Sequence, residues 1–176
     1  MINNTYILSV ELNDYPNLFN RRIHIPIDFN LFEIIIAILS SLRITDYEDF
    51  YIEMDKKYQY YELDFNYNKQ DFIIHYGKCD WTFLVSFIGI DITNDVAYLV
   101  SDGVGYGIVG MNKDRFYLML EDSIDHSDDT KNPIMDDEDF EFYDLDIDSL
   151  NENAKEDYSN IYQIYRNKVD KIKTAL

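Results

Sequence analysis

The sequence predicts an α+β fold, in which a mostly antiparallel sheet carries one early helix and a C-terminal helix. Three observations lead to this prediction. Short runs rich in Tyr, Ile and Phe recur along the first part of the chain, and one longer apolar run, LFEIIIAIL at 31–39, interrupts them. Near the C-terminus, apolar side chains recur at the spacing of one buried helix face. With 47% apolar residues among 176, the chain can bury a core as a single domain, 1–176.

The expected elements follow in order. Strands at 5–12 and 21–25 flank a turn at PNLFN. Asp28 or Asn30 caps the first helix, and Glu33 completes a capping-box pattern with Asn30. This helix runs to about Arg43 and is apolar on most sides, so we expect it to be buried against the sheet. Further strands are expected at 48–54, 58–65, 70–76, 79–90 and 95–101, followed by a short helix at 113–121. The C-terminal stripe consists of Leu150, Ala154, Tyr158, Ile161, Tyr165, Val169 and Ile172.

The motif HYGKCDW holds the single Cys and the single Trp of the chain. A two-residue type II′ turn at 77–78 would pair Tyr76 with Cys79 and His75 with Asp80. Cys79 is then a small core residue, and His75 faces a carboxylate that favours the charged imidazole. This register gives the hairpin one wholly apolar face, made of Phe72, Ile74, Tyr76, Cys79, Trp81, Phe83, Val85 and Phe87.

Candidate metal ligands are few. A longer loop, with Lys78 and Cys79 bulged, would let the His-x3-Cys pair bind a structural zinc, although no cofactor is expected. His126 lies among carboxylates in DSIDHSDD, where a divalent cation would be held loosely. The stretch from Asp144 fails the EF-hand pattern, with Ser149 at position 6. The metal candidates are therefore His75, Cys79, Asp80 and His126. A lone Cys, no CxxC, no P-loop and no G-x-S-x-G motif argue against an enzyme.

The charge is strongly acidic and unevenly placed. There are 34 acidic and 15 basic residues, a net charge of −19, and residues 121–148 hold 13 of the acids with a single Lys. So dense a segment repels itself, and we expect a long exposed loop. Such a field repels DNA, RNA and anionic lipid, and it favours basic partners, cations or simply solubility. The partner-binding candidates are Asp128, Asp129, Asp136, Asp137, Glu138, Asp139, Glu141 and Asp144.

Four segments of the sequence form a recognisable series: YILSVELNDYPNLFNRRIHIP, DYEDFYI, the hairpin HYGKCDWTFLVSF and the tail DFEFYDLDIDSLNENA. Together they resemble the plasmid Ri ORF-three-like family, which is also found as an accessory reading frame of insertion sequences and is often mislabelled resolvase. The first looks like the family's strand, proline, Arg-Arg pair and Val-Pro, and the second like its His-Leu-x-x-Phe segment. The third resembles the family's hairpin with one extra turn residue, and the fourth resembles its tail. The resemblance implies a compact α+β domain with a central antiparallel sheet, but no particular reaction. The family's Cys-rich stretch is replaced by YLVSDGVGYGIVG, so a metal or catalytic role is not carried over there.

Taken together, these features predict a non-enzymatic acidic binding protein. Closely spaced carboxylates imitate the phosphates that a basic nucleic-acid channel holds, so the protein would occupy and block such a channel on a partner. The frequent Ile, Asn, Tyr, Lys and Asp suggest a low-GC phage or mobile element, in which an anti-CRISPR protein acting on a Cas9-type nuclease is a concrete example. We expect a monomer or homodimer in the host cytoplasm, without contact to nucleic acid or membrane. One rival is a metal-binding protein or hydrolase of the resembled family, and another is a structural or regulatory module without a strong ligand.

Overall fold

The computed structural model describes residues 3–14, 16, 19–44, 47–93, 99–104 and 147–175, and the structural statements below concern these residues. They form a seven-stranded sheet in the order β4-β3-β5-β6-β1-β2-β7, and every neighbouring pair is antiparallel. With the two helices this is the predicted α+β class. The strands are β1 (Asn3–Leu12), β2 (Asn20–Pro26), β3 (Phe50–Glu53), β4 (Lys57–Gln59), β5 (Phe72–Tyr76), β6 (Trp81–Thr93) and β7 (Leu99–Val104). The helices are α1 (Leu31–Ser41), α3 (Ile147–Ala175) and the 3-10 turn η1 (Tyr60–Glu62).

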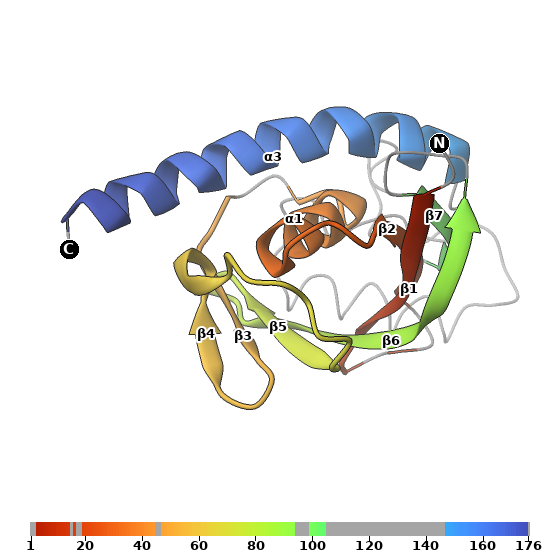
Figure 1. The fold of residues 1–176 in the computed structure, drawn as a ribbon, viewed down its shortest axis with the longest axis horizontal. Coiled ribbons are helices and arrows are strands. Elements are labelled where there is room, and N and C mark those ends of the chain that lie inside the picture. The colour runs from red at the N-terminus through yellow and green to blue at the C-terminus, as the bar shows by residue number, and fades with distance from the viewer. Residues whose placement is uncertain are drawn as a thin grey trace, which may run out of the picture.

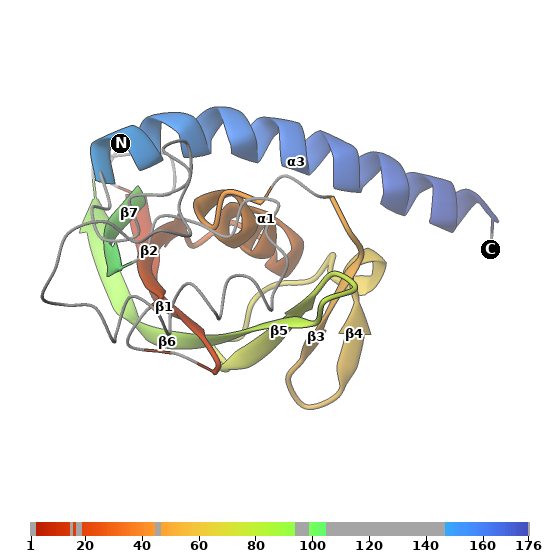
Figure 2. The same ribbon diagram turned by 180° about the vertical axis from the view of Figure 1, so that it is seen from behind.

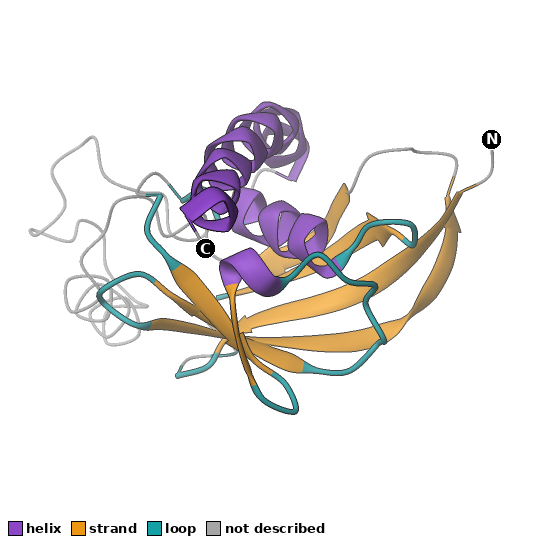
Figure 3. Cartoon of the chain, turned by 60° about the vertical axis from the view of Figure 1, so that its left-hand side comes forward, coloured by secondary structure: helices purple, strands orange, loops and turns teal. Residues whose placement is uncertain are grey.

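Both helices lie on one side of the curved sheet (Figure 3). In Figure 1, α3 runs along the top, α1 lies beneath it, and the sheet wraps round the other side of α1; Figure 2 shows the same layers from behind. The early helix is therefore the middle layer. This position explains why every residue of α1 except Glu33 is buried, as its nearly uniform apolar sequence predicted.

The start of α1 is built as the sequence predicted. The Asn30 side chain accepts the Glu33 N–H at 2.9 Å, and the Glu33 carboxylate accepts the Asn30 N–H at 2.9 Å. This reciprocal capping box satisfies donors that have no partner inside the helix. The helix ends at Ser41 with Leu42 as its C-cap, slightly before the expected Arg43.

The strand predicted at 58–65 is wrong beyond Gln59. The chain turns into η1, where the Glu62 carboxylate accepts the Gln59 N–H at 2.7 Å. The carbonyls of Leu63 and Phe65 then accept the first two N–H groups of α1, at 3.1 and 2.9 Å. These carbonyls complete the N-terminus of a helix far earlier in the chain, so they are not available to a sheet ladder.

The C-terminal stripe is confirmed as the buried face of α3. Leu150, Ala154, Ile161, Tyr165 and Val169 are buried, and the other two members of the stripe are partly buried against the core. None of the described helices is both long and apolar enough to cross a membrane. The short helix expected at 113–121 lies outside the described residues.

The β5–β6 hairpin has a longer loop than the type II′ turn that the sequence predicted. Tyr76 pairs with Trp81 instead of Cys79, which leaves a four-residue loop, 77–80. Cys79 is exposed in this loop, so its prediction as a core residue is wrong. Because the register moved by two residues, each side chain of the ladder keeps its face. The apolar face consists of Phe72, Ile74, Tyr76, Trp81, Phe83 and Val85, all buried, with Phe87 half-buried.

Candidate partner-binding site

The predicted partner-binding residues lie outside the described part of the chain. They are Asp128, Asp129, Asp136, Asp137, Glu138, Asp139, Glu141 and Asp144, and the metal candidate His126 lies there too. The structure describes the chain up to Val104, at the end of β7, and again from Ile147, at the start of α3. Of the acidic stretch 121–148 it therefore describes the last two residues.

A side-chain clamp joins β7 to the beginning of α3. The Asn151 amide accepts the N–H of Val100 at 2.8 Å and donates to the Val100 carbonyl at 2.9 Å. Val100 is fully buried and lies on the edge strand of the sheet, so Asn151 takes the place of a further strand there. The two elements on either side of the gap in the described chain, β7 and α3, are therefore in direct contact through Asn151 and Val100.

Charge along α3 is polarised. Its first half carries Asp148, Glu152, Glu156 and Asp157 with one lysine, Lys155. Its second half is mainly basic and contains Arg166, Lys168, Lys171 and Lys173. This order complements the helix dipole, and it also places the acidic half of α3 directly after the acidic stretch 121–148.

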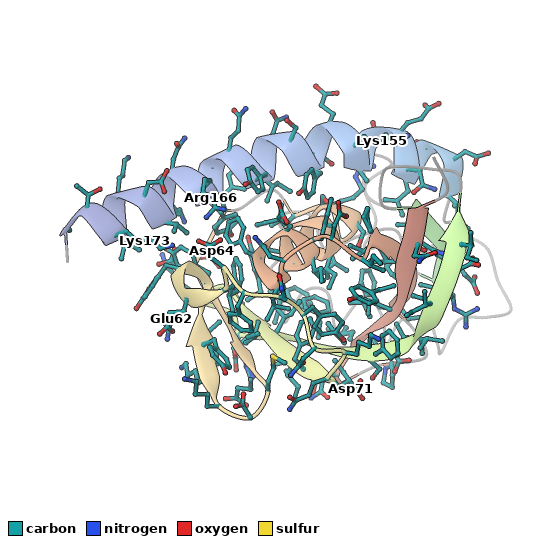
Figure 4. All side chains as sticks on the ribbon, in the orientation of Figure 1. Glu62, Asp64, Asp71, Lys155, Arg166 and Lys173 are labelled. Atoms are coloured by element: carbon teal, nitrogen blue, oxygen red, sulfur yellow. The ribbon has the colours of Figure 1, made fainter. Side chains whose placement is uncertain are left out.

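The basic half of α3 is engaged within the molecule. Arg166 donates to both carboxylate oxygens of Asp64 at 2.9 Å, and Lys173 donates to one of them at 2.7 Å (Figure 4). Burial by itself would raise the pKa of Asp64, but the hydrogen bonds from Arg166 and Lys173 outweigh it and hold that pKa below its ordinary value. Lys168 similarly donates to Asp49 at 3.0 Å. Arg166, Lys168 and Lys173 therefore neutralise acids of the same chain.

Glu48 connects α3 to the β5–β6 loop. The Tyr165 hydroxyl donates to the Glu48 carbonyl, and the Tyr76 hydroxyl accepts the Glu48 N–H at 3.2 Å. The Glu48 carboxylate accepts the Lys78 N–H at 2.8 Å. Burial raises the pKa of Tyr165 well above its ordinary range, so its hydroxyl remains a donor at any ordinary pH.

His75 lies between two carboxylates. Its ring stacks on Tyr51 with centroids 4.4 Å apart, Nδ1 is 3.2 Å from Asp80, and Nε2 is 3.6 Å from Glu53. The expected contact with Asp80 is present, although Asp80 reaches it from the loop. The loop has the greater length that the zinc hypothesis required, but the two carboxylates face different ring nitrogens and do not converge with His75 on one ion. No group of three or more metal-ligating side chains occurs among the described residues.

Sequence reasoning missed the role of Arg21, which is fully buried. Its Nε donates to the Ser41 carbonyl at 3.4 Å, and another guanidinium nitrogen donates to the Asn20 carbonyl at 2.8 Å. Burial lowers the pKa of Arg21 to about 9. The side chain places a positive charge at the C-terminal end of α1, whose last turn has no basic residue of its own. Strand alternation was the available signal, because Arg21 occupies the same face as Ile23.

Comparisons with known proteins inform the fold alone. No known protein family matches the chain, and no curated protein matches it. Among solved structures, the fold is similar to that of MM3350, a protein of unknown function from Methanosarcina mazei Go1, with a TM-score of 0.66 and 13% sequence identity. The match covers 85% of this chain and 98% of that chain.

Proposed function

We propose that the protein is a non-enzymatic acidic binding protein that occupies the basic nucleic-acid channel of another protein. The observation that carries this proposal is the concentration of 13 acids and one Lys in residues 121–148. The clamp between Asn151 and Val100 supports it, because it fixes the start of α3, where the acidic stretch ends at Asp148, to the edge of the sheet. Carboxylates at that density replace the phosphate charges that such a channel holds.

The polarised charge of α3 supports the same function. The acidic first half of the helix extends the negative field of the stretch 121–148, whereas Arg166, Lys168 and Lys173 are engaged with Asp64 and Asp49. A basic partner would therefore be steered toward the acidic first half of α3 and the stretch that precedes it in the sequence. A Cas9-type nuclease of a bacterial host is the partner we propose to test, because its guide–target heteroduplex lies in a positively charged channel.

The test measures DNA binding by guide-loaded Cas9-type nucleases in the presence of this protein, by fluorescence anisotropy of labelled target DNA. We expect the wild-type protein to displace DNA and to lose potency steeply as salt rises. Replacing Asp136, Asp137, Glu138 and Asp139 with Asn or Gln should weaken displacement by about tenfold or more, which corresponds to about 1.4 kcal/mol.

The matched control removes the same number of charges elsewhere. Its four substitutions are Asp28→Asn, Glu53→Gln, Asp55→Asn and Asp170→Asn, all at exposed positions of the described structure and outside the acidic half of α3. We expect this variant to lose less potency than the variant of the acidic stretch. Equal losses would show that only total charge matters, and unchanged DNA binding with the wild-type protein would refute the proposed function.

A further inference from the structure

The last part of β6 carries an exposed apolar strip. The side chains of Ile88, Ile90 and Ile92 are 54%, 51% and 68% exposed, and that of Ile27 is 41% exposed. Ile92 pairs with Asn4 of β1, and the Asn4 carbonyl accepts the Ile27 N–H at 3.2 Å, so Ile27 and Ile92 flank one residue of β1. We call Ile27, Ile88, Ile90 and Ile92 the isoleucine strip. Exposed apolar side chains that are gathered in one patch are typical of a surface that binds another protein or a ligand.

The strip adjoins a stretch of β6 that has a described strand on one side alone. β1 pairs with β6 as far as Thr93, but β5 pairs with it no further than Val85. Figures 1 and 2 show β6 curving on past the end of β5. The Ile92 N–H points away from β1, since it bonds to the Asp91 side chain, and Ile90 faces the same way by strand alternation. The Ile90 N–H and carbonyl are therefore directed toward the side where a further strand would lie.

A carboxylate lies at each end of the edge of β6 that β5 leaves unpaired. Asp71 accepts the Phe87 N–H at 2.9 Å, where the pairing with β5 has ended, and Asp91 accepts the Ile92 N–H at 2.7 Å. Asp71 and Asp91 are exposed, as is Asp28 beside Ile27. Lys69, whose ammonium lies 5.9 Å from the Phe87 ring, supplies a positive charge nearby. The rim of the strip thus has three carboxylates, with Lys69 near Phe87 and His24 Nδ1 3.8 Å from Asp91.

The carboxylates at this edge favour a basic segment over a second copy of the chain. A second copy pairing through the same edge would bring its own Asp71 and Asp91 against these two, in addition to its net charge of −19. A segment with Lys or Arg would instead pair with both carboxylates. Its apolar side chains, on the alternate face, would then cover the isoleucines.

We propose that the isoleucine strip and the adjoining edge of β6 bind an extended, basic segment of a partner protein, which adds to the sheet as a further strand. Main-chain hydrogen bonds at Ile90 would supply affinity, while Ile90, Ile92 and the rim carboxylates would supply selectivity. The inference rests on the proposed function in one respect, the expectation of a basic protein partner. It does not require the acidic stretch 121–148, so the two can fail separately.

The probe is a short fluorescein-labelled peptide of alternating Lys and Val, titrated with the full-length protein and followed by fluorescence anisotropy. We expect saturable binding that weakens about tenfold or more in the double variant Ile90→Ser/Ile92→Ser, because both side chains would lose apolar contact. The matched control is Tyr47→Ser, which truncates a 39% exposed hydrophobic residue. Its neighbour Glu48 contacts the loop that precedes β6, whereas the strip lies at the other end of that strand. Tyr47→Ser should leave the affinity unchanged.

Two further arms separate strand addition from simple charge attraction. A peptide of the same sequence with every residue N-methylated cannot donate the main-chain bonds, and we expect it to bind at least several-fold more weakly. The variant with Asp136, Asp137, Glu138 and Asp139 neutralised should bind the unmethylated peptide as the wild type does. Absence of binding, equal binding of the methylated peptide, or loss of binding in the neutralised variant without loss in Ile90→Ser/Ile92→Ser would each overturn the proposal.

Discussion

Gly77 is the residue on which the β5–β6 loop depends. Its φ is 71°, a left-handed conformation that L side chains rarely adopt, and an added Cβ would collide with the Glu48 carboxylate. That carboxylate is held in place by the Lys78 N–H at 2.8 Å. We expect Gly77→Ala to reduce the free energy of unfolding by about 2–3 kcal/mol, from backbone strain together with a weakened hydrogen bond. Urea denaturation measures the loss.

Gly89 supplies the control for this substitution. It lies within β6, and an added Cβ would meet no atom within 4 Å. Gly89→Ala should therefore change the free energy of unfolding by no more than about 0.5 kcal/mol. If the two substitutions destabilised the protein equally, neither the left-handed conformation of Gly77 nor its closeness to Glu48 would explain why a glycine is needed there.

The same loop shows where prediction from sequence stops at the scale of single residues. Alternation correctly assigned the faces of the hairpin, but it could not separate a two-residue turn from a four-residue loop, because a register shift of two preserves every face. The longer loop is held by groups from another part of the chain. The Asp49 carbonyl accepts the Gly77 N–H at 3.1 Å, and the Glu48 carboxylate accepts the Lys78 N–H. No local pattern around Cys79 contains this information.

At the scale of elements, the Asn151 side chain makes both hydrogen bonds of the clamp between α3 and β7. Asn151→Ala would leave the N–H and the carbonyl of buried Val100 without their partner. We expect a loss of about 1–3 kcal/mol in the free energy of unfolding, since buried backbone groups without partners are costly. Hydrogen exchange at the Val100 amide should accelerate, because the start of α3 would open from β7 more easily.

Asn153 is the matched control on the same helix. It is exposed, and its amide donates to the Ser149 hydroxyl at 3.4 Å. Asn153→Ala should change the free energy of unfolding by less than about 0.5 kcal/mol and leave exchange at Val100 unaffected. If Asn151→Ala also left that exchange rate unchanged, contacts other than the clamp would be holding α3 to β7.

Helices were predicted better than strands because their signals are local. The capping box of Asn30 and Glu33 and the stripe of α3 are each readable within a few turns, and both are confirmed. The segment 58–65 has strand-like composition, yet its later carbonyls bond to the start of α1. A tertiary contact thus overrode a local preference. The sequence likewise did not show that β5 stops pairing with β6 at Val85. The isoleucine strip, which lies beyond that point, was therefore not predicted.

At the scale of the whole molecule, composition revealed the amount of charge but not its arrangement. The acidic stretch was visible directly, whereas the contact between β7 and the start of α3 depends on Asn151, which no charge pattern singles out. The pairing of Arg166 and Lys173 with Asp64 joins residues about a hundred positions apart. These contacts leave fewer unpaired charges in the second half of α3 than its sequence alone suggests.

Self-repulsion within a chain of net charge −19 should make its stability depend on salt. Raising NaCl from about 0.01 M to about 1 M shortens the Debye length from about 30 Å to about 3 Å. Ion pairs such as Arg166–Asp64 are screened too, but each contributes about 1 kcal/mol or less, so relief of repulsion should prevail. We expect Tm to rise with salt, by about 2–4 °C for each kcal/mol of repulsion removed.

Neutralising Asp136, Asp137, Glu138 and Asp139 shows whether the acidic stretch contributes to this repulsion. The variant has a net charge of −15, four units less negative than −19. It should be more stable than the wild type at low salt, and the two should converge at high salt, where the charges are screened. Scanning calorimetry of both proteins over the same salt series measures the difference. An identical salt dependence would place these charges too far from the folded core to affect it, and would leave binding of a basic partner as the one process in which they are expected to act.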